Sequence, residues 1–198
     1  MLKAVIFDVN GVFIESDFFS NRLAKDYTVP ALEVVAALKA IMPIVRRPEA
    51  PSCYQLCKPY LQRWRVELGE EEFFAYWFSG ERLVPEMVHY AQQLGKKMSV
   101  FLLSNNFRER TEYYRQQFPE LFAAVDKAYF SCETGYVKPE ENAWKNILRE
   151  NKLRPEQCLY FDNDEENVAA ARGLGLPAEH WKGRAQAKKV VKNLMRGE

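Results

Sequence analysis

Polar side chains suited to phosphoryl transfer follow the apolar runs of this sequence. They are Asp8 and Asn10, then Ser104 and Asn105, then Lys138, and finally Asp162, Asn163 and Asp164. An aspartate can accept a phosphoryl group and so divide a hydrolysis into easier steps. Because the transferred group is strongly anionic, a hydroxyl, a lysine and a divalent cation are needed around its oxygens. Mg²⁺ takes oxygen ligands, usually carboxylates, waters and substrate, and these residues supply the required types.

The elements that must position these residues are indicated by alternating patterns along the chain. Apolar runs predict central strands of a mainly parallel sheet at residues 4–7, 99–103, 127–130 and 157–161. Helical patterns lie between them, starting at Pro85 and ending near Gly95, and then at residues 107–118, 139–150 and 165–172. This alternation predicts a doubly wound α/β fold, in which ligands bind beyond the carboxyl ends of the strands.

A long helical segment interrupts this alternation directly after the first strand. Residues 15–82 are rich in helix formers and aromatic residues and contain no good strand candidate. We interpret the segment as an inserted helical cap that closes over the strand ends. The predicted division is a core domain at residues 1–13 and 84–198 with a cap domain at residues 14–83. An independent N-terminal helical domain is a weaker interpretation, because it would separate Asp8 from its sheet.

Each polar residue taken alone has an ordinary structural explanation. Asp, Asn and Ser are common in turns and at helix N-termini. The case for a site rests on the whole set, which occurs in order at the same end of one parallel sheet. We therefore expect Asp8, Ser104, Lys138 and Asp162 to meet around one anion-sized space, with the Lys138 ammonium directed at Asp8.

Composition narrows the possible partners. The chain has 198 residues, 47% of them hydrophobic, with a formal net charge of +1. This balance does not favour a nucleic-acid interface, and no segment has the length of a membrane span. The cysteines show no paired ligand spacing and are expected to be reduced. We expect a cytoplasmic protein, a monomer or homodimer, that binds a small phosphorylated substrate and neither nucleic acid nor membrane.

The four polar segments together resemble the haloacid dehalogenase (HAD) superfamily. FDVNG resembles the family's D-x-D-G motif, LLSNN its second motif, GYVKPE its third and YFDNDEENVAAARGLG its acidic fourth. The resemblance covers nearly the whole chain, and the helical insertion is similar to the family's type 1 cap. It implies a HAD-like (Rossmannoid) core and a Mg²⁺-dependent phosphatase acting on small phosphorylated metabolites through an aspartyl-phosphate.

The resemblance also implies roles for particular residues. It gives Asp8 as the nucleophile and Asn10, Ser104 and Lys138 as the other catalytic positions. It places the phosphate against Gly11, Ser104, Asn105 and Lys138, and Mg²⁺ against Asp8, the backbone carbonyl of Asn10, Asp162, Asn163 and Asp164.

Two amides stand where the family has acids. Asn10 occupies the position of the aspartate that protonates the leaving alcohol, and an amide has no titratable proton to give. General acid–base catalysis is typically worth about 10²–10⁴-fold in rate, so slow turnover of poor leaving groups is predicted. Asn163 replaces a second acid in the fourth motif, where the change weakens or shifts Mg²⁺ binding.

Three interpretations follow. A weakened Mg²⁺-dependent phosphatase is favoured over a non-catalytic relative that binds a phosphorylated ligand or a partner. A 2-haloacid dehalogenase ranks lowest, because dehalogenases place an aromatic residue at the position of Asn10 and serine-asparagine residues in the fourth motif.

The cap offers few readable signals of the substrate. Its aromatic residues, such as Phe73 and Trp77, are expected to form mainly the core of the cap, and some of them could line a pocket. Arg46 and Arg47 are candidates for binding a substrate anion, although a solvated turn is the favoured interpretation for both.

Overall fold

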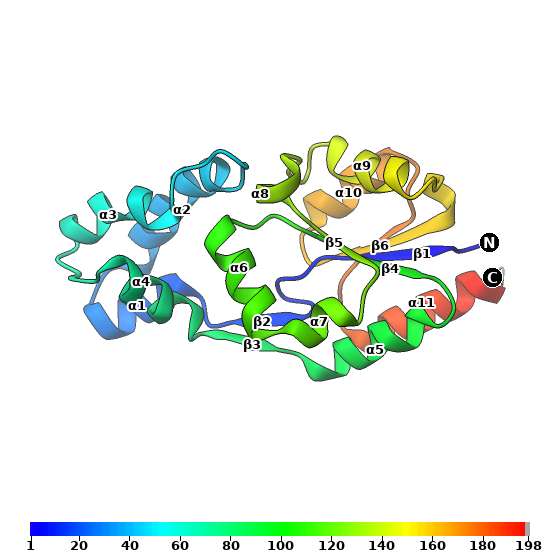
Figure 1. Ribbon diagram of the computed structural model, residues 1–198, viewed down its shortest axis with the longest axis horizontal. Helices are drawn as coiled ribbons and strands as arrows, with labels where there is room; N and C mark the ends of the chain where they lie inside the picture. Colours follow the sequence, from blue (N-terminus) through cyan, green and yellow to red (C-terminus); the bar gives the residue numbers. More distant parts are fainter. Residues whose placement is uncertain (197–198) are drawn as a thin grey trace.

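A parallel sheet forms the centre of the molecule in the computed structural model, which describes residues 1–196 (Figure 1). Its strands lie in the order β5-β4-β1-β6-β7. Their bounds are β1 Ala4–Phe7, β4 Ser99–Ser104, β5 Lys127–Phe130, β6 Cys158–Asp162 and β7 Ala178–His180. Every neighbouring pair is parallel. The predicted α/β class with a mainly parallel sheet is therefore confirmed.

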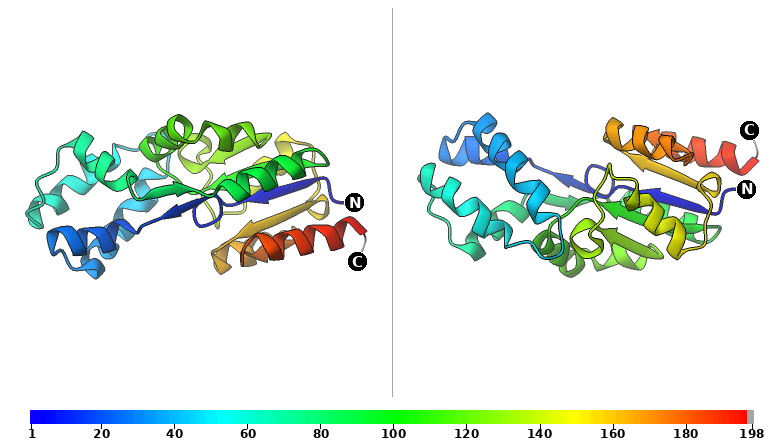
Figure 2. Two further views of the ribbon diagram at one scale, coloured as in Figure 1. Left: turned by 90° about the horizontal axis from the view of Figure 1, so that it is seen from below. Right: turned by 90° about the horizontal axis from the view of Figure 1, so that it is seen from above.

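Helices cover both faces of this sheet, as the views of Figure 2 show. The core helices are α5 Pro85–Gly95, α6 Arg108–Gln117, α7 Pro119–Ala123, α8 Ser131–Thr134, α9 Asn142–Glu150, α10 Glu165–Gly173 and α11 Arg184–Arg196, with a 3₁₀ turn, η1, at Pro155–Gln157. Side chains alternate between the faces of a strand, and the apolar runs follow from burial on both sides. Within β1, Val5 and Phe7 pack toward α5 and α11, whereas Ala4 and Ile6 pack toward α9 and α10.

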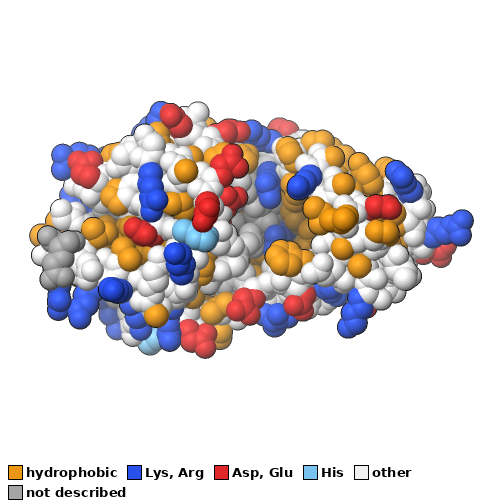
Figure 3. All heavy atoms as spheres, turned by 180° about the vertical axis from the view of Figure 1, so that it is seen from behind, with side chains coloured by type: hydrophobic (Ala, Val, Ile, Leu, Met, Phe, Trp, Pro, Cys, Tyr) orange, Lys and Arg blue, Asp and Glu red, His pale blue; other side chains and the backbone are white. Residues whose placement is uncertain are grey.

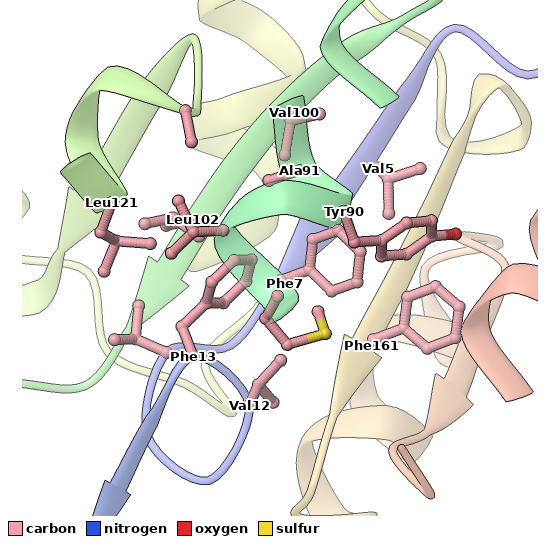
Figure 4. Close-up of a cluster of buried hydrophobic side chains, with 14 of the residues drawn as sticks. Val5, Phe7, Val12, Phe13, Tyr90, Ala91, Val100, Leu102, Leu121 and Phe161 are labelled. Atoms are coloured by element: carbon pink, nitrogen blue, oxygen red, sulfur yellow. The ribbon is translucent and has the colours of Figure 1, made fainter. Parts of the chain in front are cut away.

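Phe7 lies at the centre of the larger core cluster, just before the predicted site (Figure 4). Its ring stacks on Phe161 at 5.3 Å between centroids and meets Phe13 edge-on at 5.6 Å. Tyr90 of α5 and Trp181 also contact it edge-on. The packing of this side chain fixes the end of β1, from which Asp8 emerges.

The insertion between β1 and α5 folds as a group of helices. They are α1 Phe19–Tyr27, α2 Ala31–Val45, α3 Cys53–Arg63 and α4 Glu70–Phe78, and Figure 1 shows them beyond one end of the sheet, away from both termini. They share an apolar cluster in which Phe73 is fully buried and Trp77 stacks on Phe19. We call this group of helices the cap. The boundaries proposed for its domain stay a prediction.

The expectation that residues 15–82 hold no strand was wrong at the two ends of the segment. Strands β2 Ile14–Ser16 and β3 Glu81–Leu83 pair antiparallel, with Ile14 opposite Leu83 and Ser16 opposite Glu81. This two-stranded ribbon pairs the segment that leads from the core into the cap with the segment that leads back to the core. Strands this short, with mixed burial, carry too little alternation to be recognised in a sequence.

Other elements differ from their predicted bounds. Strand β7 was not predicted, because it is a short edge strand with no apolar run. Helix α9 begins at Asn142 rather than at Pro139, since the Glu140 N–H bonds to the Val137 carbonyl and closes a turn after Lys138. Within residues 1–196, none of the helices combines the length and apolarity that crossing a membrane requires.

The central position of Phe7 gives a testable expectation for stability. Replacing a buried aromatic side chain by alanine removes apolar contacts and leaves a cavity, at a cost of about 3–5 kcal/mol. Phe7→Ala should lower the free energy of unfolding by this amount in urea denaturation followed by circular dichroism. Leu32, which is 83% exposed on α2, is the control, and Leu32→Ala should change the free energy by less than about 0.5 kcal/mol. Equal effects of the two substitutions would contradict the packing described.

Candidate active site

The carboxyl ends of the central strands bring the predicted residues together. Asp8 follows β1, which lies between β4 and β6, and Ser104 and Asp162 are the last residues of those two neighbours. Lys138 comes from the loop between α8 and α9. All four are buried, with exposed fractions of 6% for Asp8, 1% for Ser104, 5% for Lys138 and 1% for Asp162.

A buried lysine between two carboxylates forms the centre of this arrangement. The Lys138 Nζ lies 2.7 Å from Asp8 Oδ1 and 2.6 Å from Asp162 Oδ2. Burial would lower the pKa of Lys138, but the two carboxylates outweigh it and hold the pKa above its ordinary value. Burial, to which the Asp162 charge adds, holds the pKa of Asp8 above its ordinary value, and Lys138 limits this rise. Lys138 thus favours the carboxylate form that a nucleophile requires.

Asp162 holds this centre in place through its other hydrogen bonds. Its Oδ2 also accepts from the Tyr160 hydroxyl and, at 3.1 Å, from Asn167 Nδ2. Its Oδ1 accepts from the Asp164 backbone N–H at 2.8 Å. Both oxygens therefore have protein partners, and the side chain aligns Lys138 with Asp8.

Asn105 fixes the loop that carries Lys138. Its side-chain amide accepts from the Lys138 backbone N–H and donates to the Lys138 carbonyl, both at 2.8 Å. The amide is thus directed at the lysine loop, although the sequence resemblance had implied a role on the phosphate. Through this contact, Asn105 acts on the position of Lys138.

Asn10 faces Ser104 on one side and a buried polar network on the other. Its Nδ2 donates to Ser104 Oγ at 3.2 Å, and its Oδ1 accepts from the Tyr114 hydroxyl at 2.7 Å. The Tyr114 hydroxyl also lies 2.9 Å from Glu81 Oε2, and Arg110 pairs with the other oxygen of Glu81 at 2.6 Å. Burial is the main cause that holds the pKa of Tyr114 well above that of an ordinary tyrosine, so the group stays a neutral phenol.

This network was missed by sequence reasoning. Tyr114 lies in a helix and Glu81 at the end of the insertion, 33 positions apart in the chain. Neither residue occurs in a recognisable pattern, and only the antiparallel ribbon places Glu81 beside α6. No sequence signal marked the pair.

The loops after β1 and β6 touch where the resemblance places a metal. Gly11 has a φ of +80°, and a Cβ there would lie 2.2 Å from Asn163 Nδ2, so the contact requires glycine. Asn163 Nδ2 donates to the Asn10 carbonyl at 3.2 Å. Asp164 instead accepts from the Glu166 N–H at the start of α10. Residues 1–196 contain no group of three or more His, Cys, Asp or Glu side chains that could hold a metal.

The oxygens at this contact suit a Mg²⁺ site with a single carboxylate. Asp8 offers a carboxylate, Asn10 a backbone carbonyl and Asn163 an amide whose oxygen and nitrogen can exchange by rotation. Mg²⁺ keeps several waters and needs only one or two carboxylates from a protein. The donors therefore fit the ion. They include one carboxylate, that of Asp8, whereas the sequence resemblance had also implied those of Asp162 and Asp164.

A cavity of about 780 Å³ separates the cap from the core. Figure 3 shows it as a hollow between the two parts of the molecule, with basic side chains inside it. Asn10, Gly11 and Asn163 line its core side, and Phe19 and Trp77 line its cap side. The cavity therefore opens onto the loop that follows Asp8.

Arg46 and Arg47, considered together from the sequence, have different surroundings. Arg47 is exposed, donates to the Gly135 carbonyl at 2.6 Å and pairs with Glu140. Arg46 is half-buried and lines the cavity. The interpretation of both as a solvated turn was wrong for Arg46.

Fold and site together define an α/β protein with an aspartate nucleophile candidate paired to a buried lysine at the carboxyl ends of parallel strands. The family profile described as haloacid dehalogenase-like hydrolase matches residues 2–175 of the chain. The chain belongs to this family, and the resemblance inferred from its four polar segments is confirmed.

Known proteins agree with this assignment at the level of fold. The HAD family enzyme BT-2542 of Bacteroides thetaiotaomicron superposes with a TM-score of 0.80 at 19% identity, over 92% of this chain and 94% of that one. The L-2-haloacid dehalogenase of Xanthobacter autotrophicus has a TM-score of 0.66 at 14% identity, over 91% and 77%. Bifunctional epoxide hydrolase 2 of Rattus norvegicus is 26% identical over 109 residues, which are 53% of this chain and 20% of the relative. The match thus spans about a fifth of that curated relative.

The buried lysine yields a second stability expectation. Lys138→Met leaves the Asp8 and Asp162 carboxylates buried without a cation, and breaking a buried ion pair in this way costs about 3–5 kcal/mol. Urea denaturation should show this loss, and the double variant Asp8→Asn, Lys138→Met should recover part of it.

The control is Lys145→Met on α9, which breaks an exposed pair with Glu141 just before the helix and should cost less than about 1 kcal/mol. If Lys138→Met were as mild as the control, the charges of the centre would not depend on one another.

Proposed function

We propose that the protein is a Mg²⁺-dependent phosphomonoester hydrolase that acts on small phosphorylated metabolites and is slow because it lacks a general acid. The observation that supports this most strongly is the buried Asp8–Lys138 pair, at 2.7 Å. Close to this pair, Asn10 lines the cavity and bonds to Ser104. A carboxylate paired with a lysine at this place suits nucleophilic attack on phosphorus.

In the proposed reaction, the residues of the site have the following roles. A carboxylate oxygen of Asp8 forms a bond to phosphorus, and the bond from phosphorus to the ester oxygen breaks, so the electron pair leaves with that oxygen. Lys138 and Ser104 bind the oxygens of the transferred group, where negative charge gathers. A water molecule then attacks phosphorus, which releases phosphate and restores the Asp8 carboxylate.

Mg²⁺, when bound, neutralises charge on the phosphoryl oxygens and on Asp8. Asp8, the Asn10 carbonyl and the Asn163 side chain would hold it. The proposal is supported by the fit of these donors and by the relative BT-2542, which has been crystallised in complex with magnesium and inorganic phosphate.

Asn10 explains why the reaction is slow. Its amide can donate a hydrogen bond toward the leaving oxygen, yet it cannot transfer a proton. Tyr114 holds the amide through the 2.7 Å hydrogen bond to Oδ1, and its raised pKa makes the phenol a poor proton donor. A leaving group that is stable as an anion is therefore turned over far better than an alkoxide.

Two alternatives are separated from this proposal by assay. A non-catalytic protein would bind a phosphorylated ligand at the same residues and turn over none. A 2-haloacid dehalogenase would use Asp8 to displace a halide without a metal ion, but Asn10 stands where that chemistry has an aromatic residue.

The first expectation concerns the leaving group. Wild-type protein with Mg²⁺ should hydrolyse an aryl phosphate measurably and alkyl phosphates only weakly, and a chelator should abolish both activities. Asn10→Asp should raise alkyl phosphate turnover by about 10²-fold or more, because it restores a proton donor, and should change aryl turnover much less. Asp8→Asn should abolish both activities.

The matched control for this assay is Asn21→Asp, an exposed amide on α1, which should leave both activities unchanged. Aryl turnover that survives Asp8→Asn or the chelator would refute the mechanism. Absence of all turnover, also in Asn10→Asp, would favour the non-catalytic protein, and metal-independent release of halide from a 2-haloacid would favour the dehalogenase.

The second expectation concerns the phosphoenzyme. Asn10 also leaves the attacking water without a base, so hydrolysis of the aspartyl-phosphate should be slower than its formation from an aryl ester. Rapid mixing with an aryl phosphate should then release a burst of phenolate close to one equivalent per protein before the steady state. Intact-mass spectrometry should show one added phosphoryl group, and Asn10→Asp should remove both signals. A linear time course with unmodified protein would contradict this order of rates.

A further inference from the structure

Arg46 is a half-buried cation that has no hydrogen-bond or ion-pair partner within residues 1–196. It ends helix α2 of the cap, and its Nε is shielded from solvent and makes no hydrogen bond. Within residues 1–196 its guanidinium is bonded to no carboxylate, in contrast to the neighbouring Arg47, which pairs with Glu140. Buried charges are normally paired, because a guanidinium loses its hydration there.

Two of the other cations that line the cavity have carboxylate partners. Arg110 pairs with Glu81 at 2.6 Å and Arg82 with Asp17 at 2.8 Å. Two further charged side chains, Lys39 and Glu15, are exposed at the rim and are opposite in sign. Two half-buried arginines line the cavity within residues 1–196, and of these Arg110 pairs with a carboxylate whereas Arg46 does not.

Arg46 also occupies the junction between the cavity and the nucleophile. It lines the 780 Å³ cavity together with Asn10 and Asn163, and the same three residues line the smaller pocket that contains Asp8 and Lys138. A group attached to a phosphate on Asp8 would pass this junction on its way into the cavity.

The surroundings of Arg46 make its unpaired state costly before a ligand binds. Burial, and then the nearby charge of Arg110, lowers the pKa of Arg46, and the charge of Asp8 opposes this shift only in part. An anion placed against the guanidinium would relieve both effects. Apolar side chains of the cap, among them Phe19, Leu38 and Trp77, also line the cavity, and they suit the carbon skeleton of a ligand.

We propose that Arg46 determines specificity by binding a second anionic group, carried on the leaving group of the substrate close to the ester oxygen. This inference rests on the proposed phosphatase function. The substrate class is a phosphomonoester with an acidic substituent near the phosphate and an apolar remainder. The planar fork of arginine matches a carboxylate or a second phosphate, and a carboxylate is the probe used below.

The test compares substrates that differ only in this charge. The probes are the ortho, meta and para isomers of carboxyphenyl phosphate, each paired with its neutral carbamoylphenyl counterpart of similar size. Aryl esters are used because they do not need the proton that Asn10 cannot give. For at least one isomer, wild-type kcat/KM should favour the carboxylate by about tenfold or more, the effect of one charged hydrogen bond.

Variants then assign the preference to Arg46. Arg46→Met should bring the ratio of carboxylate to carboxamide close to one, and Arg46→Lys should retain part of it. The control is Arg63→Met, an exposed arginine of the cap helix α3, which should keep the wild-type ratio. Thermal unfolding of each variant separates a loss of the preference from a loss of fold.

Failure of the inference can be told from failure of the proposed function. Turnover of the neutral carbamoylphenyl phosphates reports on the phosphatase, and the ratio within each pair reports on Arg46. If no ester is turned over, calorimetric binding of the corresponding aryl phosphonates gives the same ratios. A ratio near one for every isomer in the wild type overturns the inference. So does an Arg46→Met variant that weakens both members of a pair equally, because Arg46 would then bind the phosphoryl group itself.

Discussion

The arrangement of this site depends on the charge of Lys138, which is buried between Asp8 and Asp162. A buried ammonium is tolerated only with close opposite charges, so the loops after β1 and β6 and the loop before α9 must meet at one point. A parallel sheet supplies this convergence, because adjacent strands end at the same edge. The hydrogen bonds between the Asn105 side chain and the backbone of Lys138 then hold the loop before α9, which does not directly follow a strand of the sheet.

The cap and the core share more than the cavity between them. Glu81 lies on the ribbon that leads back from the cap, and it contacts Tyr114 and Arg110 of the core helix α6. Tyr114 in turn contacts Asn10, two residues after Asp8. The ribbon is thereby connected to Asn10, the position at which we propose that this chain lacks a general acid. The Asn10 amide accepts a hydrogen bond from the phenol of Tyr114 and adds no further negative charge next to Glu81.

Sequence reasoning could predict those parts of the fold that local pattern determines. Strands β1 and β5 have the predicted bounds, and β4 and β6 differ by a residue. Strands β1, β4 and β6 are buried on both faces and are therefore apolar runs, whereas the edge strand β5 is buried only in its second half. The ribbon β2–β3 and the edge strand β7 have no such pattern. The residues around Lys138 were predicted from their order along the chain, whereas Tyr114 and Glu81 were not, since only tertiary structure joins them. Arg46 and Arg47 likewise differ in burial, and two adjacent arginines in a sequence give no sign of that difference.

The contact of Arg47 has a consequence for how the cap is held against the core. This cap residue bonds to the Gly135 carbonyl and to Glu140, on either side of Lys138 in the chain, so it fastens the cap to the lysine loop. Arg47 and Glu140 are each about half exposed, and exposed ion pairs contribute less than about 1 kcal/mol. The fastening is therefore easily released by thermal motion, and rising ionic strength weakens it further. The contact between the cap and the lysine loop thus responds to salt, whereas the buried charge pairs of Lys138 are screened much less.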